Sequence, residues 1–239
     1  FRITTWGETH GAGVGVVVDG CPAGLPLERE DVQKYLDRRK PGQSKYTTQR
    51  KEGDQVEILS GIFEGRTTGT PISMVVYNKD QRSKDYSNIK DIYRPGHADF
   101  TFDMKYGFRD YRGGGRSSGR ETIGRVAAGA VAAKVLKELG IEIKAYAKAI
   151  AGIEVSKDHF DFAEMNNNPF NMPDKEAAKL VQEKADQMIK EMDSIGGIIE
   201  CQITGMPVGI GETVFDKLDA ELSKAIMSIG SVKGFEIGD

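Results

Sequence analysis

The sequence has few cysteines and lacks a long apolar segment. Cys21 and Cys201 are its only two cysteines, too few and too far apart for a disulfide framework or a CxxC metal site. We therefore expect both to be buried thiols in a reducing compartment. No apolar run reaches the roughly 18 residues that a membrane helix needs, and no charged-then-apolar leader opens the chain. These absences predict a cytoplasmic protein with no membrane partner.

Several motifs of catalytic and cofactor sites are also missing. The chain contains no HxxxH or HExxH pair and no Cys/His cluster, which argues against a metal site. It has no G-x-S-x-G elbow, which disfavours a serine hydrolase. It also lacks the dinucleotide-binding G-x-G-x-x-G after a strand and a P-loop ending in GK[ST]. Without a Walker lysine or an acidic metal cluster, a phosphate-transferring enzyme is disfavoured as well.

The remaining composition is that of an ordinary globular protein. The 239 residues are 38% hydrophobic and 29% charged, which suffices for a sizeable core. We expect one domain over residues 1–239. The chain opens on Phe1 instead of Met and ends on VKGFEIGD, which resembles an unfinished strand. We therefore expect further residues at both ends.

Positive charge is concentrated in two segments. Residues 1–125 contain 21 Lys and Arg against 17 Asp and Glu, whereas residues 126–239 contain 12 against 19. Six cations lie within 38–51 and six within 105–125. A solvated face or an arginine-rich nucleic-acid-binding module is one interpretation of such segments. These arginines lie among Gly, Ser, Thr and Pro, however, and that pattern favours compact pockets in which guanidiniums bind carboxylate or phosphate.

Hydrophobic periodicity predicts alternating strands and helices, an α+β pattern without an obvious linker. We expect strands over 14–20, 55–65, 68–78 and 196–205, and helices over 27–39, 118–140, 174–193 and 215–229. In the second helix, Ser118 and Glu121 have the spacing of a capping box, and Gly140 would end the helix.

A short pattern occurs twice. VDGCPAG at 18–24 and ITGMPVG at 203–209 each place G-x-P-x-G between an apolar strand and an amphipathic helix. This echo raises the hypothesis of an internal duplication, although Gly and Pro mark turns in many unrelated proteins.

The segment YRGGGRSSGRET at 111–122 has the composition of an anion site. Gly113, Gly114 and Gly115 would let the backbone approach a ligand closely. We expect a helix to begin at Ser117 or Ser118, so that its free N–H groups point to the same place. Arg116 and Arg120 would add positive charge there, so the segment predicts a site for a phosphate or a polyanionic cofactor.

Two of the three histidines lie next to a glycine in segments expected to be loops. His10 is in ETHGAG and His97 in RPGHAD, whereas His159, in KDHFDF, is typical of a surface or boundary residue. A loop histidine often hydrogen-bonds its own turn. Two of them beside cationic loops favour acid/base chemistry instead.

The segments GETHG at 7–11, RPGHAD at 94–99 and RSSGRET at 116–122, in this order, resemble the signature segments of chorismate synthase. The resemblance extends over essentially all 239 residues, but the family's carboxyl-terminal portion, with further flavin-binding residues and an acidic residue for proton handling, is absent. For the fold, the resemblance implies a single-domain β-α-β sandwich with helices layered between antiparallel sheets, assembled as a homotetramer.

For function, the resemblance implies conversion of 5-enolpyruvylshikimate 3-phosphate to chorismate. Phosphate leaves C3 and a hydrogen leaves C6 in a 1,4-elimination without net redox change that requires reduced FMN (FMNH2). Two sources of the reduced flavin stay open: reduction by the protein itself with NADPH, and a separate reductase. The substrate carries a phosphate and two carboxylates, so its desolvation demands several fixed cations.

The resemblance also assigns roles to individual residues. His10 would protonate the departing phosphate, and His97 would protonate or hydrogen-bond the reduced flavin. The remaining residues would bind substrate or cofactor: Arg39, Arg94 and Arg120 for the anionic groups of the substrate, with Lys45 and Arg50 as helpers, and Arg116, Ser117, Ser118, Gly230 and Ser231 for the flavin.

Four positions depart from the family pattern. Thr9 replaces the usual Ser of the first motif, and Gly119 replaces a common Ala of the third. Both keep the hydroxyl or the small size that the motif needs. Gly230 and Ser231 stand in place of a frequent Asn-Ala pair, so a side-chain amide contact to the flavin is lost there.

Overall fold

The computed structural model describes residues 1–47, 52–79 and 90–238. The chain divides into two compact units, and each is described by itself. The first unit comprises the described residues within 1–40, 51–138 and 207–239. The second comprises those within 41–50 and 139–206. The proposed helper Arg50 lies outside the described residues.

Strands and helices alternate along the chain, with short 3-10 helices between some of them. The elements are β1 (Arg2–Gly7), β2 (Gly13–Asp19), α1 (Arg29–Arg39), β3 (Val56–Ile58), β4 (Ile62–Phe63), β5 (Arg66–Thr67), β6 (Ile72–Tyr77), α2 (Asp99–Tyr106), η2 (Gly115–Ser117), η3 (Gly119–Glu121), α3 (Thr122–Glu138), β7 (Glu142–Ile150), β8 (Ile153–Glu154), η4 (Lys157–His159), η5 (Phe162–Asn166), α4 (Lys175–Glu191), β9 (Gly197–Thr204) and α5 (Leu218–Met227).

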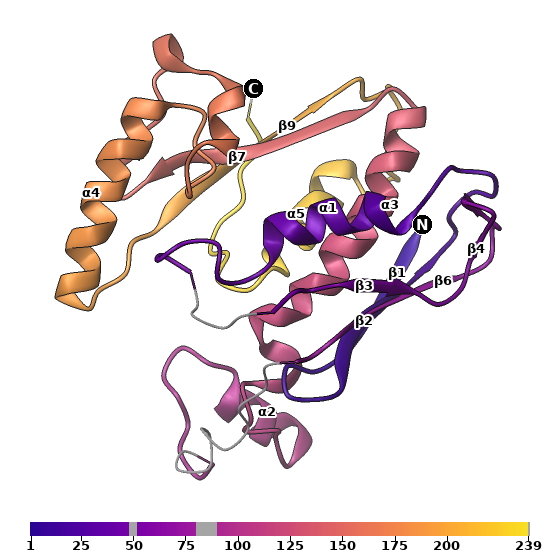
Figure 1. The fold of residues 1–239 in the computed structure, drawn as a ribbon, viewed down its shortest axis with the longest axis horizontal. Coiled ribbons are helices and arrows are strands. Elements are labelled where there is room, and N and C mark those ends of the chain that lie inside the picture. The colour runs from indigo at the N-terminus through magenta and orange to yellow at the C-terminus, as the bar shows by residue number, and fades with distance from the viewer. Residues whose placement is uncertain (48–51, 80–89, 239) are drawn as a thin grey trace. The chain divides into compact units, whose positions relative to one another are not determined.

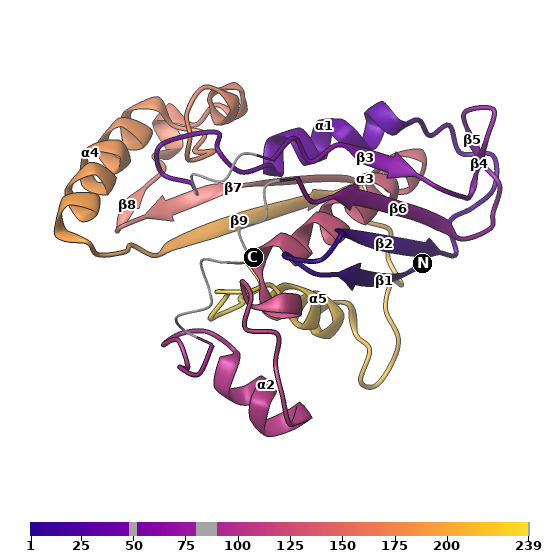
Figure 2. The ribbon, with the colours of Figure 1, turned by 60° about the horizontal axis from the view of Figure 1, so that its bottom comes forward.

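The first unit is built on an antiparallel sheet in the order β1-β2-β6-β3 (Figure 2). The β-branched run of β2 pairs with β6 in a register that places Val16 opposite Met74. Helices α1 and α3 lie against this sheet (Figure 1). One apolar core joins the sheet and both helices, and its fully buried members include Val16, Leu36 and Val131. Burial of apolar side chains of this size stabilises the fold by about 1.5 to 3 kcal/mol each.

A glycine lets α3 approach the sheet closely. A Cβ added at Gly124 would lie 2.8 Å from Thr5 Cγ2 of β1 and 3.0 Å from the carbonyl oxygen of Gly15 in β2. A larger residue would push the helix away from the strands. The beginning of α3 is therefore held against strands β1 and β2.

The second unit contains the antiparallel sheet β8-β7-β9 and helix α4. A register shift between Ala147 and Ala149 marks a bulge where β7 pairs with β9. Asp174 caps α4, since its carboxylate accepts hydrogen bonds from the backbone N–H groups of Glu176 at 2.9 Å and Ala177 at 3.0 Å. The helices predicted over 27–39, 174–193 and 215–229 are confirmed as α1, α4 and α5.

Two details of the predicted elements were wrong. The strand expected over 55–65 breaks after β3, because Gly61 has a φ of +82° and leads into the short β4-β5 hairpin. The helix expected from Ser118 begins at Thr122, and the Ser118 hydroxyl caps the 3-10 helix η3 by accepting from the N–H of Arg120. The Glu121 carboxylate accepts from the Thr5 hydroxyl at 3.0 Å and from Arg125, instead of completing a capping box.

The repeated G-x-P-x-G pattern has the same local backbone in both copies. Gly20 and Gly24 have φ of +79° and +85°, and Gly205 and Gly209 have φ of +75° and +92°. The similarity is local, so the internal duplication stays a hypothesis. The mixed α+β class with antiparallel sheets is confirmed, whereas the layered sandwich and the single domain stay predictions. None of the described helices is both long and apolar enough to cross a membrane.

Candidate active site

His10 lies in the loop of residues 8–12 that joins β1 to β2, here called the histidine loop. The loop is folded on itself, with the N–H of Gly11 donating to the carbonyl of Glu8 at 3.1 Å. The His10 side chain and that of Thr9 are buried, with 8% and 6% of each residue exposed. The Thr9 hydroxyl is a buried polar group without a hydrogen-bond partner among the described residues. A buried hydroxyl of this kind is costly unless a ligand satisfies it.

Residues 112–119, here called the glycine loop, pack directly against the His10 imidazole. A Cβ added at Gly113 would lie 2.5 Å from His10 Cδ2 and 2.6 Å from His10 Nε2. Gly113 also has a φ of +68°. Only glycine satisfies both conditions, so the ring lies flush against bare backbone. At Gly113 the bare backbone therefore approaches the His10 imidazole, while the predicted close approach of this segment to a ligand stays a prediction.

The third loop of the site carries Arg94 and His97. Arg94 donates to the Asp99 carboxylate from its backbone N, Nε and Nη2, at 3.0, 2.8 and 3.0 Å. These hydrogen bonds lower the pKa of Asp99 to about 2, although burial acts in the opposite direction. A Cβ added at Gly114 would lie 3.6 Å from Arg94 Nη2, so Arg94 borders the glycine loop.

The two histidines therefore lie on loops that meet at the same glycine loop. His97 is exposed, and its ring Nδ1 lies 3.0 Å from the Pro95 carbonyl oxygen. The backbone N–H of His97 donates to the Arg94 carbonyl. His10 is buried against Gly113, and Arg94 borders Gly114. A buried and an exposed imidazole at one loop cluster are suited to two different proton-transfer tasks.

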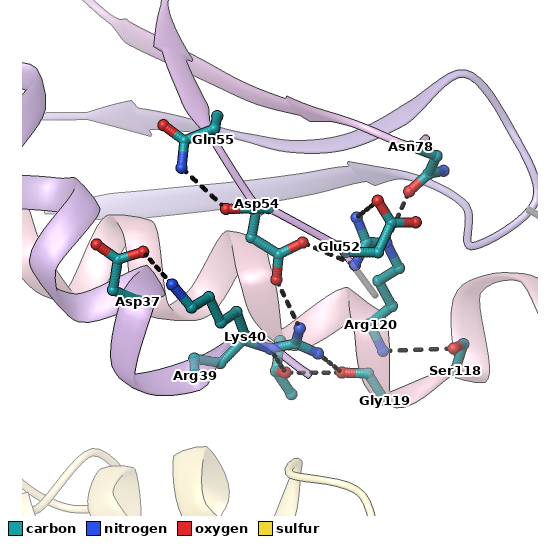
Figure 3. A network of polar contacts seen from close by, with 12 residues as sticks. Asp37, Arg39, Lys40, Glu52, Asp54, Gln55, Asn78, Ser118, Gly119 and Arg120 are labelled. Atoms are coloured by element: carbon teal, nitrogen blue, oxygen red, sulfur yellow. Dashed lines mark hydrogen bonds and ion pairs between the residues drawn. The ribbon is translucent and has the colours of Figure 1, made fainter. Parts of the chain in front are cut away.

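A buried aspartate binds two of the predicted substrate arginines (Figure 3). The Asp54 side chain has no exposed surface and accepts from Arg39 Nη1 at 3.1 Å and from Arg120 Nη1 at 2.9 Å. Asp54 has a φ of +43°, a conformation that costs a non-glycine residue roughly 1 to 2 kcal/mol. Gln33 of α1 holds this backbone by donating to the Asp54 carbonyl at 3.2 Å. The carboxylate thus fixes guanidiniums from α1 and η3 at one point.

Arg120 keeps one donor nitrogen without a hydrogen-bond partner in the described part of the chain. Its Nε donates to Asn78 Oδ1 at 2.6 Å, and its Nη1 to Asp54. Its Nη2 is buried without a hydrogen-bond partner among the described residues, and Glu52 lies at the ion-pair distance of 3.9 Å from it. A buried N–H group of this kind suits an anionic ligand.

The side chains predicted to contact flavin make contacts within the chain. Arg116 donates to the Gly7 carbonyl at 2.8 Å and to the Thr5 hydroxyl at 2.6 Å, so it points toward β1. The Ser117 hydroxyl donates to the Gly114 carbonyl at 2.7 Å, and Ser118 caps η3. These three residues therefore shape the glycine loop.

The second flavin segment and the helper lysine lie elsewhere in the chain. Gly230 and Ser231 follow α5 in the first unit, and Ser231 has a φ of +71°. This end of α5 is joined to α3 by a hydrogen bond of 2.6 Å from Arg125 Nη1 to the Ser228 hydroxyl. Lys45 lies in the second unit, where its ammonium is 2.7 Å from Asp186, and this hydrogen-bonded partner raises the pKa of Lys45.

The sequence did not indicate that two carboxyl groups, those of Glu8 and Asp110, lie beside Gly115 of the glycine loop. A Cβ added at Gly115 would lie 3.6 Å from Asp110 Cβ and 3.9 Å from the Glu8 carboxyl carbon. Burial, the hydrogen bond to Asp110 and the charge of Asp110 raise the pKa of Glu8. Arg112 lowers the pKa of Asp110. Glu8 lies inside the GETHG motif, so the motif could have identified it, whereas nothing in the sequence marked Asp54.

The described residues contain no group of three or more His, Cys, Asp or Glu side chains that could hold a metal ion. The chemistry that this arrangement supports is anion binding by fixed guanidiniums beside an acid/base imidazole.

Comparisons with known proteins agree with this arrangement. A family model described as chorismate synthase matches residues 1–239. The chain is 71% identical to the chorismate synthase of Lachnospira eligens and 65% identical to that of Agathobacter rectalis, in both cases over 239 residues. Each alignment covers 100% of this chain and 65% of the relative. A crystal structure of a chorismate synthase superposes with a TM-score of 0.78 at 31% identity, over 98% of this chain and 67% of the other.

Proposed function

The chain belongs to the chorismate synthase family, and from this premise we propose that the full-length protein converts 5-enolpyruvylshikimate 3-phosphate to chorismate. The reaction is a 1,4-elimination of phosphate that requires reduced FMN and leaves the overall oxidation state unchanged. The observation that carries the proposal is the packing of His10 against the glycine loop. The same loop borders Arg94 at Gly114 and accepts a hydrogen bond from the N–H of Arg120 at Ser118.

Arg39, Arg94 and Arg120 are proposed to hold the phosphate and the carboxylates of the substrate. Buried carboxylates already orient them, Asp54 for Arg39 and Arg120, and Asp99 for Arg94. A preoriented guanidinium loses little conformational entropy when it binds an anion. Each charge-assisted hydrogen bond to the substrate would then return about 1.5 to 3 kcal/mol.

His10 is proposed to give its proton to the phosphate oxygen that leaves C3. Because the residue is only 8% exposed, little water competes for that proton, and the Gly113 backbone fixes the plane of the ring. A positioned acid of this kind typically contributes a factor of about 10² to 10⁴ to the rate.

The residues of the glycine loop fit a bound FMN through backbone more than through side chains. The unsatisfied Thr9 hydroxyl belongs to a side chain beside Gly113, where the His10 ring leaves no room for a Cβ. The side chains of Arg116, Ser117 and Ser118 bond within the chain. We propose that this segment holds the cofactor with its N–H groups. Reduced FMN, when bound, supplies transient electron donation to the substrate. With Nδ1 of His97 donating to the Pro95 carbonyl, its Nε2 would exchange a proton with the flavin.

Further properties of the family are proposed for the whole protein. They are a second flavin contact at Gly230 and Ser231, substrate contacts by Lys45 and Arg50, homotetrameric assembly around a layered sandwich, and a cytoplasmic location. The source of the reduced flavin, NADPH or a separate reductase, is part of the same proposal. The family match argues against the alternative of a nucleic-acid-binding module.

Phosphate release by the full-length protein tests the function. Under anaerobic conditions we expect release from the substrate with reduced FMN and none with oxidised FMN. His10→Ala should slow release by at least about a hundredfold. Release that is indifferent to the redox state of the flavin would refute the mechanism.

A further inference from the structure

Asn78 stands at the junction of the histidine loop and Arg120. It directly follows β6, whose last residue Tyr77 pairs with Gly13 at the start of β2. The N–H of Asn78 donates to the carbonyl of Ala12 at 3.0 Å, so the backbone ladder continues by one bond into the histidine loop. The pairing of β6 with β2 therefore places Asn78 beside the loop that carries His10.

The side-chain amide of Asn78 makes three hydrogen bonds. Its Nδ2 donates to the carbonyl oxygens of Glu8 at 2.9 Å and Gly11 at 2.8 Å. Its Oδ1 accepts from Arg120 Nε at 2.6 Å. This orientation is the only one that satisfies all three contacts, since a reversed amide would face two carbonyl oxygens with its own oxygen and an N–H donor with its NH2 group.

The two carbonyl groups that Asn78 holds lie on either side of Thr9 and His10. Binding both ends of this short segment fixes the place from which the imidazole projects, and Gly113 then fixes its face. Asn78 Oδ1 and the Asp54 carboxylate together orient the Arg120 guanidinium by accepting from its Nε and its Nη1. Arg120 Nη2 then has no hydrogen-bond partner among the described residues and could bind a ligand. Figure 3 shows Asn78 and Asp54 approaching Arg120 together.

We propose that Asn78 is a positioning residue that fixes the position of the His10 imidazole relative to the anion-binding guanidinium of Arg120. The proposal rests on the proposed function for the roles of these two residues. The coupling itself is a property of the described contacts. Displacement of a catalytic group by about 1 Å can cost a factor of about 10² in rate.

A second asparagine in the chain provides a matched control. Asn168, in the second unit, likewise donates from Nδ2 to two carbonyl oxygens, those of Glu164 at 2.7 Å and Met172 at 2.8 Å. Its Oδ1 accepts from backbone N–H groups of Phe170 and Met172 instead of from a guanidinium. Asn168→Asp therefore removes the same kind of backbone clamp without touching His10 or Arg120.

The experiment compares Asn78→Asp, Asn78→Ala and Asn168→Asp in the full-length protein. Asn78→Asp keeps an acceptor for Arg120 Nε but places an oxygen against two carbonyls, so the histidine loop should move while Arg120 stays. We expect kcat to fall at least about tenfold with KM for the phosphorylated substrate within about threefold of wild type. Asn78→Ala loses all three bonds, so it should lower kcat and raise KM.

The ring signals of His10 in NMR spectra provide a readout that does not depend on activity. They are assigned by comparison with His10→Ala. We expect them to shift in both Asn78 variants and to stay in place in Asn168→Asp, even where the three variants lose similar amounts of thermal stability. Arg120→Lys keeps the charge but lacks Nε, so it tests the coupling from the other end and should also shift the His10 signals.

The outcomes separate this proposal from the proposed function. If wild type shows no flavin-dependent phosphate release, the function fails, while the His10 signals still test the coupling. Unshifted His10 signals in Arg120→Lys and in the folded Asn78 variants would overturn the inference. So would losses of kcat that follow only the melting temperature, as expected for a purely structural residue.

Discussion

Replacing Gly113 with alanine tests the packing on which the candidate site depends. The added Cβ would lie 2.5 Å from His10 Cδ2, whereas carbon atoms in contact prefer a separation of about 3.5 to 4.0 Å. The imidazole or the loop must therefore move by about 1 Å, and a misplacement of that size can cost a factor of about 10² in rate. The positive φ of +68° adds a further cost in stability of roughly 1 to 2 kcal/mol.

Gly24→Ala separates the two effects. Gly24 has a φ of +85°, and a Cβ added there would meet nothing within 4 Å. Both variants should lose stability in urea denaturation because of the positive φ, but only Gly113→Ala should lose about a hundredfold in flavin-dependent phosphate release. The reasoning is refuted if, at equal fractions of folded protein, Gly113→Ala keeps the activity of Gly24→Ala.

Two pH dependences follow from the carboxyl groups of the site. Because Arg94 lowers the pKa of Asp99 from 3.8 to about 2, the Asp99 carboxylate should contribute about 2 kcal/mol that is present above pH 3.8 and lost as the pH falls through 2. Asp99→Asn should therefore be less stable than wild type at pH 7, with a gap in the free energy of unfolding that narrows toward pH 2; a constant gap would contradict this. The pKa of Glu8 is raised above 4.5, so its contribution is complete below pH 4.5 and lost as the pH rises through the folded-state value. Denaturation curves should show wild type losing stability relative to Glu8→Gln as the pH rises above 4.5, and a pH-independent difference would contradict the raised pKa of Glu8.

Local sequence patterns were sufficient for the long elements of the fold. Helix α4 was predictable because its apolar positions repeat at helical spacing after a capping aspartate, and β2 because it is a β-branched run. The start of α3 was not predictable, since Glu121 bonds to Thr5, more than a hundred residues away, instead of capping its own helix. Such long-range contacts override local preference and leave no local pattern.

The site shows the same division. Motifs identified His10 and the glycine loop, and the structure brings them into contact. The motifs did not indicate which groups of the chain the arginine side chains contact in the absence of a ligand. Arg116 is of the residue type that binds anions, yet its guanidinium donates hydrogen bonds to β1. The direction of a guanidinium is set by which carboxylates and carbonyls surround it, and those partners come from distant segments.

The carboxylates also bear on which ligands the candidate site would accept. In the described part of the chain, Asp54, Glu52 and Asp99 lie beside Arg39, Arg120 and Arg94, so the positive charge of these arginines is largely compensated. A compensated cluster attracts anions weakly at long range, and a polyanion such as nucleic acid would gain little from it. Binding must then come from fixed N–H groups that match a small ligand at short range, such as Arg120 Nη2. Selection by geometry in place of net charge favours a compact substrate with several anionic groups.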